Sequence, residues 1–261
     1  MGRGCRLSQS AAARLPEQRG APNGRLPCAM LALALLPALW AAGAAAAELG
    51  ADEVRARIEA ASGAAPDLAD LDLSGLDLAG VDFKGADLRG SVLKGANLQG
   101  ADLGEANLDL VILRDANLQG ATLAGASAFQ TVFSGGDLQG ADLSGAELIA
   151  KFERSNLQGA NLAGANLAAD MTNQSMGLLR AHLTKADLAG ANLAGAKLSR
   201  CTAEFADFAG ADLTGADLSR CELAGANFTG ANVAGADFTG ADVQGARFDD
   251  AAGRPQAIGL D

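Results

Sequence analysis

Residues 86–100 read ADLRG-SVLKG-ANLQG, three five-residue units that each have leucine at the centre. Leucine or phenylalanine recurs at nearly every fifth position from about Asp67 to Phe248. A period of five fits neither an α-helix, with about 3.6 residues per turn, nor a flat strand, whose side chains alternate with a period of two. A strict period of another length is the signature of stacked repeats, so the sequence predicts a solenoid.

The composition of the chain agrees with this prediction. Its 261 residues include 34 glycines, one tryptophan and no tyrosine. A globular core usually combines side chains of varied shape. Here one small and one large apolar residue alternate, which suits a narrow solenoid in which each repeat contacts only its neighbours.

The first 47 residues differ in composition from the repeats. Five arginines stand there against one acidic residue, and an apolar run follows from Ala29 to Ala47. A basic region, an apolar region and small residues before a polar sequence predict an export signal, residues 1–47, that is cleaved after Ala47. We therefore expect an exported, periplasmic protein. The long basic region also fits a bipartite leader to the thylakoid lumen, and the apolar run reaches the lower length limit of a transmembrane helix.

Cleavage would leave an acidic chain. The full sequence has 20 basic and 31 acidic residues, and residues 1–47 hold 5 of the basic and 1 of the acidic residues. Residues 48–261 therefore have 15 basic and 30 acidic residues, which gives a formal charge of −15. Such a charge argues against direct nucleic-acid binding, which needs lysine and arginine to contact phosphates. It favours solubility or a basic partner.

Two short segments flank the repeats. Residues 48–66 predict a short helix with Val54 and Ile58 on one side and Asp52 in the first turn, where the helix dipole favours an anion. We expect this helix to cap the first repeat, because the end of a solenoid exposes its core and its unpaired backbone groups. Residues 249–261 lack the motif and are predicted to form a C-terminal tail.

The repeated motif is alanine, aspartate or asparagine, leucine, any residue and glycine, and it resembles the motif of the pentapeptide-repeat family. The resemblance covers about 36 repeats in residues 67–248. It implies an all-β solenoid: a right-handed, four-sided parallel β-helix in which one repeat forms one side and four repeats form one coil. About nine coils are expected. The central residue of a repeat and the residue two before it would point inward, and the other three would point outward.

The sequence also repeats its chemistry every twenty residues, as a four-sided coil of five-residue sides requires. Leu-Ser-Arg-Cys at 198–201 returns at 218–221. The same spacing separates Phe208, Phe228 and Phe248. We therefore expect these side chains to stack on one another in successive coils.

The register of the repeat shifts twice along the chain. Central residues come one position early after Ile149, where one residue is missing. The original register has returned by Leu178, which predicts one added residue between Ala168 and Gly177. The irregular stretch 170–176 is the best candidate for a bulge or loop.

Cys201 and Cys221 are the cysteines that follow the leader. Both stand two residues before a central position and one coil apart on the same side, so about 4.8 Å should separate their Cα atoms. This spacing lies within the disulfide range of about 4.4–6.8 Å, and export would permit oxidation. Side chains stacked in register point in parallel, which favours two buried thiols. Both alternatives stay open.

Arg200 and Arg220 are candidate exposed contacts, because they replace corner glycines one coil apart. Two stacked positive charges repel each other unless acids flank them, and Glu204, Asp217 and Glu222 are the candidates. An anion or partner contact and a solvated charge cluster both fit this arrangement.

Phe129 and Phe205 are further candidate contacts. Each comes just after a central position that holds alanine, Ala128 or Ala203. Either the backbone shifts locally and buries the phenylalanine, or the ring faces outward as an apolar contact.

The sequence offers no candidate for a catalytic or metal site. His182 is the only histidine, whereas a metal site needs several clustered ligands. No nucleophile with a base partner and no phosphate-binding glycine loop stands out, and carboxylates are too frequent for a pair of them to be informative. We therefore expect no enzyme, no metal and no cofactor.

Two hypotheses for function follow. The first is a non-enzymatic, exported scaffold or protein-interaction module, with an unidentified protein or envelope component as its partner. The second comes from the resemblance, because some pentapeptide-repeat proteins match B-DNA in size and charge and bind DNA gyrase, a topoisomerase. An acidic DNA mimic of this kind would require the protein to be cytoplasmic.

The last coil, which ends at Phe248, has no evident cap. Either the tail folds over it with Ile258 and Leu260, or two chains meet end to end. We expect a homodimer through the C-terminal coil, because an open end would expose apolar surface and unpaired backbone groups.

Overall fold

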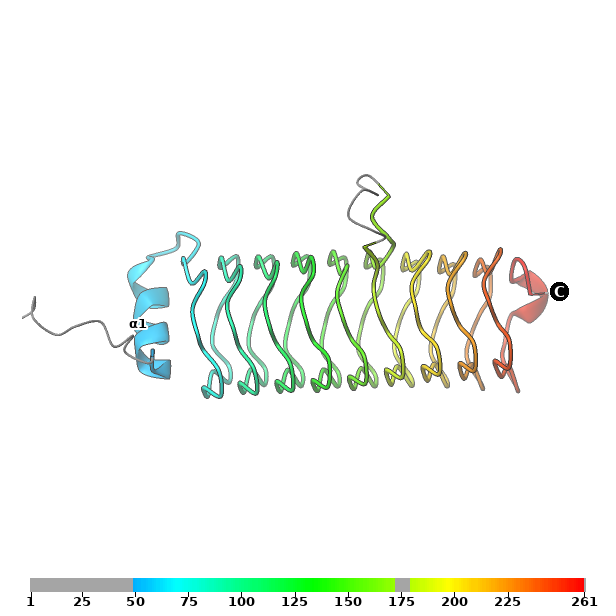
Figure 1. Ribbon diagram of the computed structural model, residues 1–261, viewed down its shortest axis with the longest axis horizontal. Helices are drawn as coiled ribbons and strands as arrows, with labels where there is room; N and C mark the ends of the chain where they lie inside the picture. The colour runs from blue at the N-terminus through cyan, green and yellow to red at the C-terminus, as the bar shows by residue number, and fades with distance from the viewer. Residues whose placement is uncertain (1–48, 172–178, 261) are drawn as a thin grey trace, which may run out of the picture. The chain divides into compact units, whose positions relative to one another are not determined.

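The computed structural model describes residues 49–171 and 179–260. The predicted export signal, residues 1–47, lies outside them. Figure 1 shows the coils following one another in chain order, with helix α1 beside the first coil and the C-terminal segment beside the last. No helix in the described part of the chain is long and apolar enough to cross a membrane.

Each repeat contributes one residue to a parallel β-bridge with the next coil. Most bridges in the described residues join positions twenty apart, as in Asp67 with Asp87. Four ladders result, one for each side of the coil, and they start at Asp67, Asp72, Asp77 and Asp82. The chain turns again directly after each bridge. The described residues therefore contain isolated β-bridges and none of the longer strands that are expected of an all-β solenoid.

The backbone of each repeat bonds to the coils on both sides of it. The amide of the central residue Leu73 donates to the carbonyl of Val92 in the next coil at 2.7 Å, and the amide of Val92 donates back to Leu71 at 2.8 Å. The corner Gly75 donates to Lys94 at 2.9 Å. Single-residue bridges are sufficient to form the fold because these bonds pair most of the buried backbone groups.

The interior is filled by two rows of apolar side chains on each side of the coil. The central leucine or phenylalanine and the small residue two before it are buried in nearly every repeat. Phe208, Phe228 and Phe248 stack in parallel, with centroids 4.9 and 4.7 Å apart, and Phe133 stacks on Phe152 at 4.8 Å. The predicted twenty-residue stacking is confirmed, and each pair adds about 0.5–1.5 kcal/mol beyond burial.

The first register shift lies where the sequence places it. Val132 pairs with Lys151, nineteen residues on instead of twenty. The amide of Ala150 donates to the carbonyl of Leu148 at 2.8 Å, so a three-residue turn replaces the usual corner.

The second register shift is larger than predicted. Lys151 pairs with His182, thirty-one residues on, which is eleven more than one coil. The prediction of a single added residue is therefore wrong. Eleven residues are one residue plus two whole five-residue repeats. An insertion of one residue and an insertion of eleven residues therefore restore the same register in the sequence. An antiparallel bridge between Asp170 and Leu179 closes the base of this insertion, whose residues 172–178 are outside the described part.

Helix α1, Ala51–Ala60, lies within the predicted range 48–66. Its Val54 is buried and Ile58 packs against the core of the first coils. The guanidinium of Arg55 donates to the carbonyl of Asp77 at 3.0 Å, which ties the helix to the first coil.

The C-terminal tail adds to the last coil without closing it fully. Ala252 and Ile258 form bridges to the preceding coil on either side of the short 3-10 helix η2, Arg254–Gln256. Leu260 packs against the core, and the guanidinium of Arg254 lies 5.4 Å from the ring centroid of Phe248. Phe248 stays half-buried and Ile258 is 54% exposed, so Ile258 does not serve as a cap.

Candidate functional site

One side of the coil departs from the pattern of the other three. We call it the second face, and it has these central residues: Leu73, Leu93, Leu113, Phe133, Phe152, Leu183, Ala203, Leu223 and Val243. The other sides mostly carry aspartate or asparagine just before the central residue. The second face carries in that row Asp72, Val92, Ile112, Val132, Lys151, His182, Thr202, Glu222 and Asp242.

The missing aspartates and asparagines change the hydrogen bonding of the backbone. On the regular sides their Oδ1 accepts from the amide two residues on, as Asp142 does from Ser144 at 3.0 Å and Asn117 from Gln119 at 3.1 Å. On the second face Asp72 and Asp242, in the first and last coils, still accept from Ser74 and Gln244, but the corresponding amides between them donate to no acceptor in the described residues. These amides belong to Lys94, Arg114, Ser134, Glu153, Thr184, Glu204 and Ala224.

The corners beside the second face also lack many of the usual glycines. Corner residues adopt positive φ, which costs about 1–2 kcal/mol for a residue other than glycine. Those that adopt it here are Asp70, Leu110, Gln130, Arg200 and Arg220 on one border and Asp115, Arg154, Lys185 and Phe205 on the other. In the described coils the remaining corners hold only Glu105 and Asp250 in this conformation. Backbone strain of this kind clusters at functional sites, so these corners mark the second face as a candidate site.

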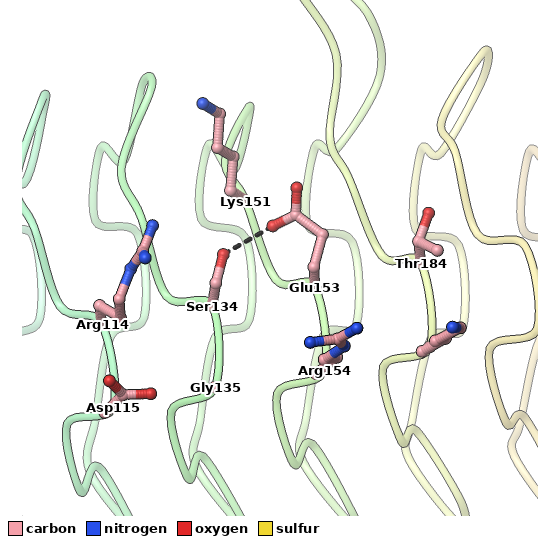
Figure 2. Close-up of a pocket in the computed structure, with 9 residues that line it drawn as sticks. Arg114, Asp115, Ser134, Gly135, Lys151, Glu153, Arg154 and Thr184 are labelled. Carbon is pink, nitrogen blue, oxygen red and sulfur yellow. Dashed lines mark hydrogen bonds between the residues drawn. The ribbon is translucent and has the colours of Figure 1, made fainter.

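A shallow hollow of about 610 Å³ lies on the second face. Its lining is Arg114, Asp115, Ser134, Gly135, Lys151, Glu153, Arg154, Thr184 and Lys185. The hollow forms because Ser134 and Gly135 are small, whereas longer side chains stand on the coils before and after them. Figure 2 shows Arg114, Lys151 and Arg154 around the hydrogen bond that Ser134 donates to Glu153 at 2.6 Å.

The hollow is rich in cations although the chain is acidic. Its basic side chains are Arg114, Lys151, Arg154 and Lys185. None of these four forms an ion pair within 4.0 Å with a described residue, whereas six ion pairs occur elsewhere in the described residues. Arg114, Lys151, Arg154 and Lys185 are all exposed, so their charges are available to a ligand.

An apolar row lies beside the hollow. Val92, Ile112 and Val132 face outward in three successive coils that their own bridges join. Ile112 is 38% exposed, and Leu110 at the adjoining corner is 59% exposed. Phe129 adds a half-buried ring at the same corner.

Phe129 and Phe205 therefore both border the second face, at opposite corners. Ala128 and Ala203 remain buried at the central positions, so the backbone does not shift to bury either ring. Phe205 is 63% exposed and lies against Gly225, where an added Cβ would meet the ring at 2.6 Å.

Arg200 and Arg220 lie on the same border as Phe129, farther along the coils. Their φ angles are +64° and +58°, as expected for residues that replace corner glycines. Glu222, which the sequence offered as a partner for them, pairs instead with Arg180 at 2.7 Å. His182 lies beside this pair, and its Nδ1 is 3.0 Å from Oγ1 of Thr202; burial lowers the pKa of the imidazole.

Cys201 and Cys221 lie directly beneath the second face. Both are buried free thiols, with their Sγ atoms 2.9 Å apart, and Cys221 also donates to the carbonyl of Leu198 at 2.9 Å. The hydrogen bond with Cys221 and burial together raise the pKa of Cys201, which keeps the thiol protonated. Whether oxidation joins the pair stays a prediction. Nowhere in the described residues do three or more histidine, cysteine or carboxylate side chains gather as metal ligands.

The comparisons with known proteins now place the chain. The family model for pentapeptide repeats matches it in eight copies, over residues 72–109, 112–148, 150–169, 178–215 and 216–251. The chain belongs to the pentapeptide-repeat family. Proteins of this family are right-handed, four-sided β-helices and generally serve as structural or interaction modules without enzymatic activity. No curated protein matches the chain in a sequence search.

Several solved structures of pentapeptide-repeat proteins are similar to it. HetL from the cyanobacterium Nostoc, involved in heterocyst differentiation regulation, is 30% identical, with 71% of this chain and 86% of HetL covered and a TM-score of 0.34. QnrB1, a plasmid-mediated fluoroquinolone resistance protein, is 22% identical (64% and 89% covered, TM-score 0.36). A protein from the Arabidopsis thaliana thylakoid lumen is 28% identical (66% and 71% covered, TM-score 0.18).

The residues that the sequence singled out lie on or beside one face, but the centre of that face was missed. Cys201, Arg200 and Phe205 were found as isolated departures from the motif. Ile112 and Arg154 were not, although their repeats, VILRD at 111–115 and AKFER at 150–154, each depart from the motif at more than one position. Writing the sequence coil by coil would have shown them, since the column of aspartate and asparagine then fails mainly on one side.

Proposed function

We propose that this protein is a non-enzymatic, exported pentapeptide-repeat scaffold, a right-handed β-helix of about nine coils whose second face binds a partner protein or an envelope component. One observation carries the proposal. From Val92 to Glu222 the second face gives up the capping aspartate or asparagine, and at many of its corners the glycine, in coils in which the other sides mostly keep them.

This difference does not disturb the burial of the core in the coils beside the hollow. Phe133 and Phe152, the central residues of the second face beside the hollow, are as fully buried as Phe208 on the third. A face that lost its pattern through poor packing would show exposed central residues in these coils. The outward side chains of the second face therefore change while its core stays packed, and outward side chains contribute to binding more than to folding.

The acidic rows of the other sides have a structural explanation. Asp142, Asp207 and Asp212 each accept a hydrogen bond from an amide two residues on, as most of their counterparts do. Their carboxylates stabilise the corners of the coil. This use of the aspartates supports a scaffold over the alternative function, an acidic DNA mimic that binds gyrase.

The export part of the proposal rests on the leader in residues 1–47. Fractionation of the native host and sequencing of the mature N-terminus test it. An exported protein that begins at Glu48 is the expected result. An uncleaved cytoplasmic protein would contradict export and would favour the gyrase-binding alternative.

The binding part is tested with a photo-crosslinking amino acid placed at one position per variant in the native host. Ile112 is the test position, and Thr122 is the matched control, because it occupies the same place in the repeat on the fourth side. We expect a discrete adduct with a partner from position 112 and none from position 122. Equal adducts from both positions, or none from 112, would contradict a binding role for the second face.

A further inference from the structure

We propose that the hollow on the second face binds an extended, acidic peptide segment of the partner, whose carboxylate and carbonyl oxygens accept from the row of outward amides that the missing aspartates leave without a cap. The inference rests on the proposed function and names the chemistry of the partner at that site.

The donors of this site are backbone amides with a fixed direction. On the regular sides the equivalent amide donates outward to an aspartate or asparagine oxygen, as Ala209 does to Asp207 at 2.9 Å. Because the backbone of the second face repeats the same coil, the amides of Arg114, Ser134 and Thr184 point outward in the same way. An oxygen of a bound peptide would take the place that Oδ1 takes elsewhere.

The dimensions of the row suit a chain and not a single small anion. The amides from Lys94 to Thr184 stand on five successive coils of the second face. Successive coils are about 4.8 Å apart, so the row is about 19 Å long. A segment of about six residues in extended conformation, at about 3.3 Å per residue, covers that length.

The charges around the row favour acidic side chains, because four basic residues of the lining outnumber its two acidic residues, Asp115 and Glu153. Arg114, Arg154 and Lys185 line the hollow, and Lys151 follows Val132 in the row where the other sides mostly carry aspartate or asparagine. Figure 2 shows Arg114, Lys151 and Arg154. Charge-assisted hydrogen bonds to carboxylates are stronger than neutral ones. The side chains at 154 and 185 occupy positive-φ corners, where glycine would avoid the backbone strain.

The apolar row decides between a peptide and a nucleic acid. Val92, Ile112 and Val132 run alongside the cations, and Leu110 extends the apolar surface at the corner. A phosphate backbone has nothing to place on these side chains, and it would also meet a chain whose residues 48–261 carry a formal charge of −15. A peptide that combines acidic and apolar residues matches both halves of the surface.

The test is a direct binding measurement. Fluorescence anisotropy follows a labelled eight-residue peptide of alternating glutamate and leucine added to the protein that begins at Glu48. A second peptide has lysine in place of glutamate, and inorganic phosphate and single-stranded DNA are offered as competitors. We expect the acidic peptide to bind, the lysine peptide not to bind, and affinity to fall as salt is raised.

Two pairs of variants locate the binding. R154E combined with K185E should lower the affinity for the acidic peptide about tenfold or more, because two exposed attractive charge contacts become repulsive. K84E combined with K197E makes the same change in net charge away from the hollow and should change affinity less than about twofold. I112N combined with V132N supplies the missing caps from the chain itself and should also abolish binding. T122N on the fourth side supplies a cap of the same kind and should leave binding unchanged.

Each other outcome overturns the inference. Binding that the control variants weaken equally would show a general charge effect. Competition by phosphate or DNA with no peptide binding would assign the hollow to phosphate groups. A dimer of the free protein that R154E with K185E dissociates would assign it to a second copy of the chain. If no peptide binds while crosslinking from position 112 persists, the acidic-peptide inference fails and the proposed function stands.

Discussion

The second and fourth sides of the coil are built from the same five-residue repeat in the same coils, yet only the fourth side keeps most of the motif on its surface. The fourth side presents Asp102, Thr122 and Asp142 where the second presents Ile112, Val132 and Lys151. Their interiors are equally well filled. In this fold, packing is decided by the residues that point inward, so the outward positions of one side can change without loss of the coil.

The largest expected effect on stability tests whether the core is packed equally well beneath the second face and beneath the regular sides. Phe152→Ala on the second face and Phe228→Ala on the third should each lower the free energy of unfolding by about 3–5 kcal/mol, because both remove a buried, stacked ring. Chemical denaturation measures both. A much smaller loss for Phe152→Ala would mean that the second face is loosely packed, and its irregular surface would then need no binding role.

A smaller effect on stability is expected when a corner glycine of a regular side is replaced by arginine, or a corner arginine of the second face by glycine. Gly140→Arg on a regular corner, at φ +65°, should cost about 1 kcal/mol, because the added side chain meets no neighbour and only the backbone is strained. Arg154→Gly, at φ +59°, should leave stability unchanged or raise it by up to about 1 kcal/mol. Thermal melts of both variants check this. A clear loss of stability in Arg154→Gly would show that the arginine serves the fold and not a ligand.

Acid should weaken the protein through capping aspartates on the regular sides. Hydrogen bonds from Arg89 and from the Thr239 hydroxyl lower the pKa of Asp87 and Asp237. A lowered pKa in the folded state gives stability that is present at neutral pH and is lost as pH falls below the ordinary carboxyl pKa of about 3.9 and through the folded value. Asp87→Asn with Asp237→Asn should therefore flatten the fall of melting temperature between about pH 5 and pH 3. An unchanged fall would contradict this use of the two carboxylates.

The smallest effect concerns the cysteines beneath the second face. Cys201 and Cys221 should appear as two reactive thiols per chain after denaturation without reductant, and as unreactive in the native protein, because burial and their mutual hydrogen bond hold the thiol protonated. A thiol assay in both states measures this. No thiol in the denatured sample would show that export has oxidised the pair to a disulfide.

The sequence predicts the coil well because the residues that form it recur at regular spacings. The five-residue period, the twenty-residue stacking of Phe208 on Phe228 and the missing residue near Ile149 all follow from spacing. The length of the second insertion does not, because one residue and eleven residues shift the register equally. The hollow was missed for a related reason. The departures around Ile112 and Arg154 gain meaning only when successive coils are compared, because together they lie on one side of the coil.

The central claim is that the second face departs from the repeat because it binds a partner. The most direct test restores the motif there with V92N, I112N and V132N, and places the photo-crosslinker at Thr184, an unchanged position that lines the hollow. We predict that the restored protein is exported and at least as stable as the original, but that the adduct formed from position 184 in the native host disappears. An adduct that persists on the restored face would contradict the account.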